Sequence, residues 1–207
     1  MLGRAAWLSL VVTLTATSAT AAAISGPIVN PANGHTYYLL GQNTWTASEA
    51  EAISLGGHLV TINDAAENAW VLSTFSLFGG SPKTLWIGLN DVTTESAFVW
   101  SSGDPSSYRN FARFGGTNNE PNNGLGQVPG GENWVQMYDI NRGKFAGFWN
   151  DISNATSESG VPLHGVVELG LVTTIPLPAA VWMLGSACFG LGFMRRCSTQ
   201  ASRNIRK

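Results

Sequence analysis

Hydrophobic periodicity between residues 33 and 169 predicts one folded region that contains two helices. The first helix follows the apolar positions of 45–55 and stops at a Gly-Gly pair. The second covers 63–75, and Asp64 followed three residues later by Glu67 is typical of a helix start. Both helices fall in the first third of the region, so we expect strands and loops in the rest of it.

Short apolar or alternating runs predict strands around and after the helices. They read NGHTYYLL at 33–40, HLVTI at 58–62, TLWIGL at 84–89, FVW at 98–100, NWVQMYDI at 133–140, FAGFWNDI at 145–152 and HGVVEL at 164–169. Between Ser101 and Glu132 the periodicity disappears, and the segment is rich in Gly, Pro, Asn and Ser. A loop this long inside a compact domain is usually functional. The pattern as a whole indicates an α+β domain.

The N-terminus has the three-part pattern of a cleaved secretory signal. Arg4 gives a short basic region, 5–14 is apolar, and small residues end at the alanines of 21–23. The apolar core is too short to span a membrane comfortably. We therefore predict a signal peptide at 1–23, followed by a lead at 24–32 into the domain at 33–169.

A second apolar segment follows a short linker at 170–174. An uncharged run at about 176–194 precedes Arg195 and Arg196, and a helix of that length just matches a hydrocarbon core of about 30 Å. The wording IPLPAAVWMLGSACFGLGFMRR resembles the VPLPA variant of PEP-CTERM sorting signals, except that Ile175 replaces the usual Val. The resemblance implies a C-terminal sorting signal at 175–207, recognised by an exosortase-type enzyme of a Gram-negative bacterium. The protein is then exported and either membrane-anchored or released to the cell surface or extracellular matrix.

Charge is distributed unevenly along the chain. All 13 acidic residues lie between Glu49 and Glu168, a span with only five basic residues. An acidic surface excludes nucleic acid as a partner and suits a hard cation such as Ca²⁺. Both cysteines, Cys188 and Cys197, lie in or beside the C-terminal segment, so the predicted domain has no internal disulfide.

Five short motifs occur in a fixed order along the domain. They are TWTASEAEAISLGGHLVTINDAAENAWV at 44–71, WIGLND at 86–91, EPN at 120–122, WND at 149–151 and Val167-Glu168. In this order they resemble the C-type lectin-like domain over nearly all of 33–169. The resemblance implies an α+β fold with two helices, short antiparallel strands and a long ligand-binding loop. Four positions depart from the family's cysteines: Ala52, Trp134, Asn154 and Val167. We expect other packing, with Trp134 as the candidate, to replace the missing disulfides.

Oxygen-bearing side chains gather in and after the long loop. Ca²⁺ takes six to eight oxygen ligands, and five side chains supply carboxylate and amide oxygens. The resemblance assigns the same five to a primary calcium site that also binds carbohydrate: Glu120, Asn122, Glu132, Asn150 and Asp151. In the family, two vicinal sugar hydroxyls complete the calcium shell, and Glu before Asn accompanies mannose, glucose and N-acetylglucosamine types. A second calcium site is left open at Asp91, Glu95, Asn123 and Asn133, with Glu132 shared.

Two functions follow from these residues, and neither is enzymatic. The first is calcium-dependent binding of an extracellular or cell-surface glycan. The second is a protein–protein adhesion module that uses the same fold without sugar. The domain lacks a Cys nucleophile and the G-x-S-x-G, H-E-x-x-H and phosphate-loop motifs, so we expect no enzyme.

Overall fold

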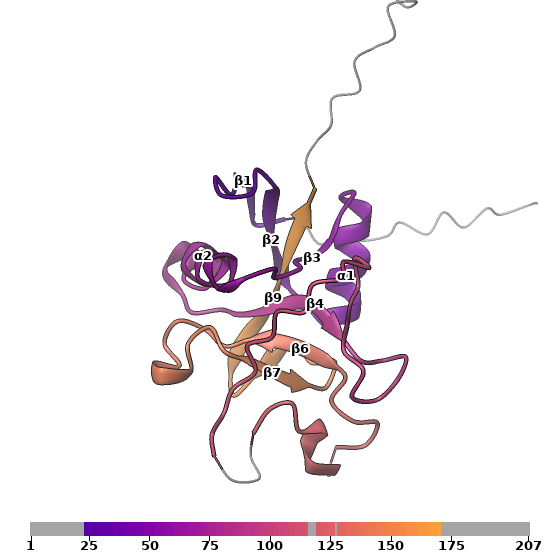
Figure 1. The fold of residues 1–207 in the computed structure, drawn as a ribbon. Coiled ribbons are helices and arrows are strands. Elements are labelled where there is room, and N and C mark those ends of the chain that lie inside the picture. The colour runs from indigo at the N-terminus through magenta and orange to yellow at the C-terminus, as the bar shows by residue number, and fades with distance from the viewer. Residues whose placement is uncertain (1–22, 116–118, 127, 171–207) are drawn as a thin grey trace, which may run out of the picture. The chain divides into compact units, whose positions relative to one another are not determined.

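The computed structural model describes residues 23–115, 119–126 and 128–170 (Figure 1). The predicted signal peptide, apart from Ala23, and the predicted C-terminal sorting signal lie outside these residues. Within the described ranges, no helix is both long enough and apolar enough to cross a membrane.

A mixed sheet organises the domain around its last strand. Its main path runs in the order β1-β2-β9-β4-β6-β7, where β9 pairs antiparallel with β2 and parallel with β4. Three two-residue strands attach to this path: β3 and β8 pair with β9, and β5 pairs with β4. The strands are β1 Ser25–Val29, β2 Thr36–Gln42, β3 His58–Leu59, β4 Thr84–Asn90, β5 Val99–Trp100, β6 Trp134–Met137, β7 Trp149–Ile152, β8 Ser157–Glu158 and β9 Val161–Leu169.

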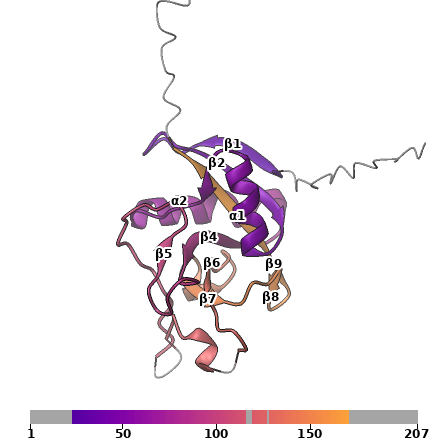
Figure 2. The same cartoon turned by 90° about the vertical axis from the view of Figure 1, so that its right-hand side faces the viewer.

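The two predicted helices are confirmed and lie on opposite sides of the central strands (Figure 1, Figure 2). Helix α1 covers Trp45–Ser54, and helix α2 covers Ala65–Phe75. Asp64 caps α2 by accepting the Glu67 N–H at 2.8 Å, while the Glu67 carboxylate accepts the Asn63 N–H at 2.8 Å. This reciprocal pairing satisfies two amide groups at the helix start. Three short 3₁₀ turns complete the elements: η1 Phe78–Gly80, η2 Asn123–Gly126 and η3 Gly143–Phe145.

The core is centred on Trp149, which is fully buried at the start of β7. Trp100, Tyr108 and Phe111 meet its ring edge-on at centroid distances of 5.8, 5.6 and 5.9 Å. Its indole N–H donates to Asn68 Oδ1 of α2 at 2.8 Å. Strand β7 is therefore held rigidly at the residue before its polar pair Asn150-Asp151.

Apolar packing occupies three of the four positions where the family has cysteines, whereas the fourth, Asn154, is hydrogen-bonded to Thr46. Ala52 and Val167 are fully buried in one cluster with Leu40. Trp134 packs with Ala155 against a second cluster that includes Trp86. The predicted α+β architecture with two helices is confirmed, and the expected role of Trp134 in packing agrees with this arrangement.

Candidate functional site

The loop between Ser101 and Glu132 folds back onto β7 at the edge of the sheet. Within this loop, Ala112 and Glu120 pair through the Glu120 N–H, which donates to the Ala112 carbonyl at 3.0 Å. The Glu120–Pro121 peptide is cis. The Asn122 amide then donates to Glu120 Oε2. Glu120 and Asn122, 29 or more residues before Asp151 in sequence, thus stand beside the end of the sheet.

Asp151 fixes the loop to β7 through backbone hydrogen bonds. Its two carboxylate oxygens accept the N–H groups of Asn122 at 3.0 Å and Asn123 at 2.8 Å. The residue is only 1% exposed. Because both of its oxygens accept backbone N–H groups, Asp151 holds the EPN segment in place. These bonds do not compensate the negative charge of the carboxylate.

Glu132 approaches the same point from the other end of the loop. Its N–H donates to Asn123 Oδ1 at 2.6 Å, directly before β6 begins. The register of β6 with β7 places Val135 opposite Asp151 and Gln136 opposite Asn150. The structure therefore brings Glu120, Asn122, Glu132 and Asp151 together through direct or one-step contacts. Asn150 lies next to them in β7, with no hydrogen bond to the other four.

Burial raises the pKa of three neighbouring carboxylates, and the charge of Asp151 raises the pKa of the other two further. Burial raises the pKa of Glu120 to about 8, and the charge of Asp151 and a hydrogen bond to it add to the rise. The pKa of Glu132 is raised by burial and then by Asp151. Burial also raises the pKa of Asp151, against the lowering effect of the Asn123 and Asn122 N–H bonds. Within the described part of the chain, no lysine or arginine is among the main causes of these three shifts, so the three carboxylates have little compensating positive charge.

Buried polar atoms without a hydrogen-bond partner concentrate at this end of the sheet. Ten such side-chain atoms occur in the described residues, and more than half of them lie on β6, β7 or the adjoining end of β4: Asp91 Oδ1, Asn133 Oδ1, Trp134 Nε1, both amide atoms of Gln136 and Asn150 Oδ1. Leaving such groups unpaired costs about 1–3 kcal/mol each. Four of the six are oxygens, the donor type that a hard cation takes. Asn150 Oδ1 is one of the five predicted ligands, and Asp91 Oδ1 and Asn133 Oδ1 belong to the second predicted site, so unpaired oxygens of the kind that Ca²⁺ takes are present at both sites.

Carboxylates alone do not build the site. In the ranges that the structure describes, no three His, Cys, Asp or Glu side chains are arranged to hold a metal ion. The five-residue set contains only three carboxylates, Glu120, Glu132 and Asp151, and they affect one another electrostatically without converging. Any cation held here needs the amide oxygens of Asn122 and Asn150 as well.

The residues of the second predicted calcium site adjoin the first. Asp91 donates its N–H to the Asn133 carbonyl at 3.1 Å, and its buried Oδ1 has no partner. Burial raises the pKa of Asp91, and the charges of Glu95 and Asp151 add to the effect. A side chain at Gly131 would meet Asn123 Oδ1 at 2.4 Å and Asn133 Oδ1 at 3.1 Å. These two amide oxygens therefore lie close to the same point.

Two residues of this region were missed by the sequence analysis. Glu158 of β8 raises the pKa of both Glu120 and Glu132, and it pairs with Arg142 at 3.6 Å. Gln136 is fully buried opposite Asn150 with both amide atoms unpaired. A polar residue inside the apolar run WVQM was the available signal for Gln136. Nothing in the sequence placed Glu158 near the loop.

Comparison with known proteins assigns the class of this domain. The profile of the family described as Lectin C-type domain matches residues 41–164. This match covers more than half of the chain, so the chain belongs to the C-type lectin family.

Curated relatives align with the same region. Identity is 36% over 115 residues with the mouse low affinity immunoglobulin epsilon Fc receptor, covering 56% of this chain and 29% of that protein. It is 30% over 127 residues with ladderlectin of Oncorhynchus mykiss, covering 61% and 60%. It is 31% over 122 residues with lectin BRA-3 of Megabalanus rosa, covering 58% and 64%. The chain thus spans less than two thirds of the length of these relatives.

Solved structures agree with the fold. The carbohydrate-recognition domain of the mouse scavenger receptor C-type lectin superposes with a TM-score of 0.50 at 27% identity, covering 66% of this chain and 90% of that one. The C-type lectin CEL-I of Cucumaria echinata gives a TM-score of 0.52 at 24% identity, with 65% and 89% covered.

Proposed function

We propose that this protein binds carbohydrate through a calcium ion held by Glu120, Asn122, Glu132, Asn150 and Asp151. The observation that carries the proposal is the concentration of unpaired buried oxygens, Asn150 Oδ1 among them, beside three carboxylates without a counter-charge. A divalent cation at these five residues would pair Asn150 Oδ1 and supply the missing counter-charge. Relatives named as lectins support carbohydrate as the ligand.

The residues divide the work between metal and sugar. Bound calcium would supply open coordination positions to two vicinal hydroxyls. The carboxylates of Glu120 and Glu132 can accept hydrogen bonds from those hydroxyls, and the NH₂ groups of Asn122 and Asn150 can donate to them. With Glu120 before Asn122, the donor and acceptor order favours sugars of the mannose, glucose and N-acetylglucosamine types. Asp151 holds the loop against β7 through the N–H groups of Asn122 and Asn123 while sugar binds and dissociates.

Export is part of the same proposal. A cleaved signal at 1–23 and a sorting signal at 175–207 would place the domain at the envelope or in the extracellular matrix of a Gram-negative bacterium. Processing by an exosortase-type enzyme would release the domain or retain it at the membrane. Many copies on one surface would raise the avidity of a shallow site whose monosaccharide affinity is about millimolar.

The test compares thermal unfolding of the chain in calcium and in EDTA. Calcium should raise the unfolding midpoint of the native protein, because a ligand that binds only the folded state stabilises it. Asn150→Ala with Asp151→Ala should abolish this rise and leave the near-UV circular dichroism of the fold intact.

A matched control removes one amide and one carboxylate outside the set. Asn141→Ala with Glu158→Ala should keep the calcium response. Unchanged calcium affinity in the Asn150/Asp151 variant would contradict the site as drawn. Calcium binding without competition by any sugar would instead favour a protein–protein adhesion module.

A further inference from the structure

A cavity of about 800 Å³ in the described residues contains none of the five proposed calcium ligands. Segments far apart in sequence meet around it: the turn before β2, the turn between α1 and β3, the start of α2, the loop at 102–104 and the end of β9. A cavity of this size is in the range that encloses small ligands in proteins. It is therefore a second candidate site, independent of the calcium proposal.

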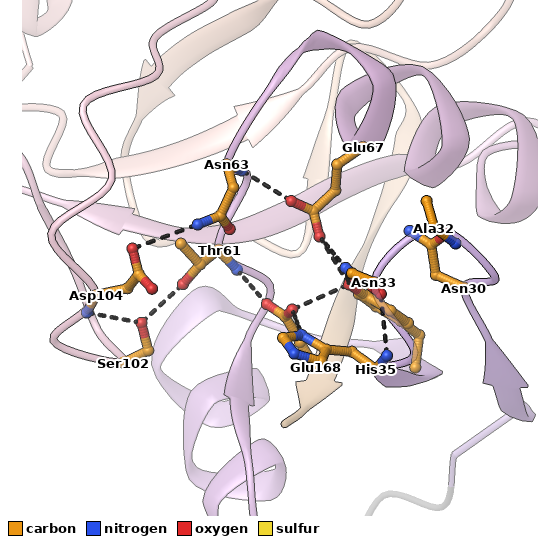
Figure 3. Close-up of polar contacts among 11 residues, drawn as sticks. Asn30, Ala32, Asn33, His35, Thr61, Asn63, Glu67, Ser102, Asp104 and Glu168 are labelled. Atoms are coloured by element: carbon orange, nitrogen blue, oxygen red, sulfur yellow. Dashed lines mark hydrogen bonds and ion pairs between the residues drawn. The ribbon is translucent and has the colours of Figure 1, made fainter. Parts of the chain in front are cut away.

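A continuous hydrogen-bonded network lines this cavity (Figure 3). The Asp104 N–H donates to Ser102 Oγ at 3.2 Å, and Ser102 Oγ lies 2.7 Å from Thr61 Oγ1. The Thr61 N–H donates to Glu168 Oε2 at 3.0 Å. These hydrogen bonds connect Asp104 of the exposed loop to Glu168 of β9 and fix the position of one relative to the other.

The network continues through a tyrosine that stands between two acids. The Tyr37 hydroxyl lies 2.7 Å from Glu67 Oε1 and 2.9 Å from Glu168 Oε1. A hydroxyl has one proton to donate, so it can serve only one of these oxygens at a time. The Asn33 amide also donates to Tyr37 and to Glu67 Oε1. Two largely buried carboxylates therefore compete for one hydroxyl proton at the edge of the cavity.

Negative charge dominates the lining as a whole. Among the residues that the structure describes, no lysine or arginine lines the cavity, whereas four carboxylates do: Asp64, Glu67, Asp104 and Glu168. The two lining histidines already pair with carboxylates through Nδ1, His35 with Glu168 and His58 with Glu49, both at 2.6 Å. An anionic ligand would be repelled by this lining, and a cationic one attracted.

An aromatic ring gives the cavity an apolar wall. Trp70 of α2 is half-buried, and its ring packs at a centroid distance of 4.8 Å on Tyr37 and 5.7 Å on Phe75. The ring is thus fixed from behind while it lines the cavity. Carboxylates beside a fixed indole are the combination that receives organic cations, whose charge binds the acids and whose hydrocarbon packs on the ring.

We propose that this cavity binds the ammonium group of an organic cation, with its alkyl chain against Trp70 and its charge among the four carboxylates. The source of that group is either a free polyamine or the lysine side chain of a protein. Neither calcium nor sugar takes part in this binding.

The experiment uses isothermal titration of the full chain carrying Asn150→Ala and Asp151→Ala in EDTA, so that failure of the calcium proposal cannot affect the result. The probes are spermidine and N-acetyl-lysine methylamide. Asp64→Asn with Asp104→Asn removes two charges and keeps the acceptor oxygens that cap α2 and receive the Ser106 N–H. Affinity for the probe should fall about fivefold in this variant.

Two control variants distinguish binding of the probes in the cavity from general attraction to an acidic protein. Glu95→Gln removes an exposed carboxylate outside the cavity and should leave affinity unchanged. Trp70→Leu should weaken spermidine binding, and near-UV circular dichroism checks that the variant is folded. Binding by both probes assigns the ammonium group alone as the recognised feature, and binding by one assigns its source.

Three results would overturn the proposal. The first is the absence of binding by either probe to the parent chain. The second is an equal loss in Glu95→Gln, which would show unspecific attraction. The third is displacement of the probes by stoichiometric Mg²⁺ or Ca²⁺ in a parallel titration without EDTA, which would make the cavity a metal site.

Discussion

Replacing Glu120 by Gln should change the stability of the domain in opposite directions with and without calcium. Glu120 is 5% exposed and stands near Asp151, Glu132 and Glu158 with no basic neighbour that lowers its pKa. Glutamine has nearly the same shape and still accepts the hydrogen bond from the Asn122 amide. The substitution therefore removes charge at the site with little change in packing.

Without calcium, the raised pKa of Glu120 determines whether Glu120→Gln is more or less stable than the native protein. The carboxyl pKa rises from 4.5 to about 8 on folding, so the folded state retains a proton that the unfolded state loses. The stabilising contribution of that proton is complete below pH 4.5 and disappears as the pH rises to about 8. Each unit of such a shift corresponds to about 1.4 kcal/mol, and we expect about 2 kcal/mol in total after the loop relaxes around the charge. In EDTA at pH 8–9, Glu120→Gln should therefore be more stable than the native protein by about 2 kcal/mol.

With calcium bound, the native protein should be more stable than Glu120→Gln. At a free calcium concentration one hundred times its dissociation constant, binding stabilises the native protein by about 2.7 kcal/mol. For a domain of this size this is a rise of several degrees in the unfolding midpoint. Glu120→Gln removes one of three anionic ligands and should lower calcium affinity at least about tenfold.

The assay is a series of thermal melts between pH 5 and pH 9 in EDTA and in calcium. Glu158→Gln serves as the matched control, because Glu158 shares the local field and is not a proposed ligand. Native calcium affinity in Glu120→Gln would refute the assignment of Glu120 as a ligand. A stability difference between the native protein and Glu120→Gln in EDTA that does not change with pH would refute the raised pKa of Glu120.

Further predictions concern sugar choice, packing and proton release. Glu120→Gln with Asn122→Asp keeps the charge of the native set and should restore calcium binding while shifting preference from mannose to galactose in competition assays. Trp134→Ala should lower the free energy of unfolding in urea by about 2 kcal/mol, since it opens the cluster beside Trp86; an unchanged value would mean that the ring contributes no packing. Ala52→Cys with Val167→Cys should form a disulfide and raise stability by about 2–4 kcal/mol under oxidising conditions only, because both residues lie in one buried cluster. Calcium binding at pH 7 should release close to one proton, measured by calorimetry in buffers of different ionisation enthalpy, and equal enthalpies in all buffers would contradict this.

Long apolar runs could be interpreted correctly from the sequence. The run TLWIGL predicted a buried strand, and all seven residues of β4 are buried. The run HLVTI was only partly correct, since β3 contains just His58–Leu59. Directly after β3 the Val60 N–H still donates to the Val166 carbonyl of β9, but the next N–H, that of Thr61, donates to the Glu168 side chain instead of the backbone. Such side-chain capping depends on β9, over 100 residues later, and local pattern does not reveal it.

Segments with weak patterns were harder to predict. Residues 24–32 were expected only to lead into the domain, yet Ser25–Val29 forms β1 on β2. This edge strand contains Pro27 and is mostly exposed, so it lacks the alternation that signals a strand.

The candidate site divides in the same way. Motif order predicted Glu120, Asn122 and Asp151 as ligands of one site; the structure places them close together, and their role as ligands stays a prediction. The unpaired Gln136 opposite Asn150 and the nearby charge of Glu158 depend on strand register. The acidic cavity beside α2 also escaped sequence reasoning, because its residues come from five separate segments.

The position of β9 bears on how the domain would carry mechanical load. Its nine residues pair with β2, β3, β4 and β8, and it ends beside the start of β2, at the end of the sheet away from the EPN loop (Figure 1). A pull between a ligand at that loop and an attachment beyond Gly170 would run along β9 and shear several rows of backbone hydrogen bonds together. Peeling would break such rows one bond at a time. This geometry is therefore expected to resist a force applied between the loop and the end of β9 better than a force that peels the strands apart.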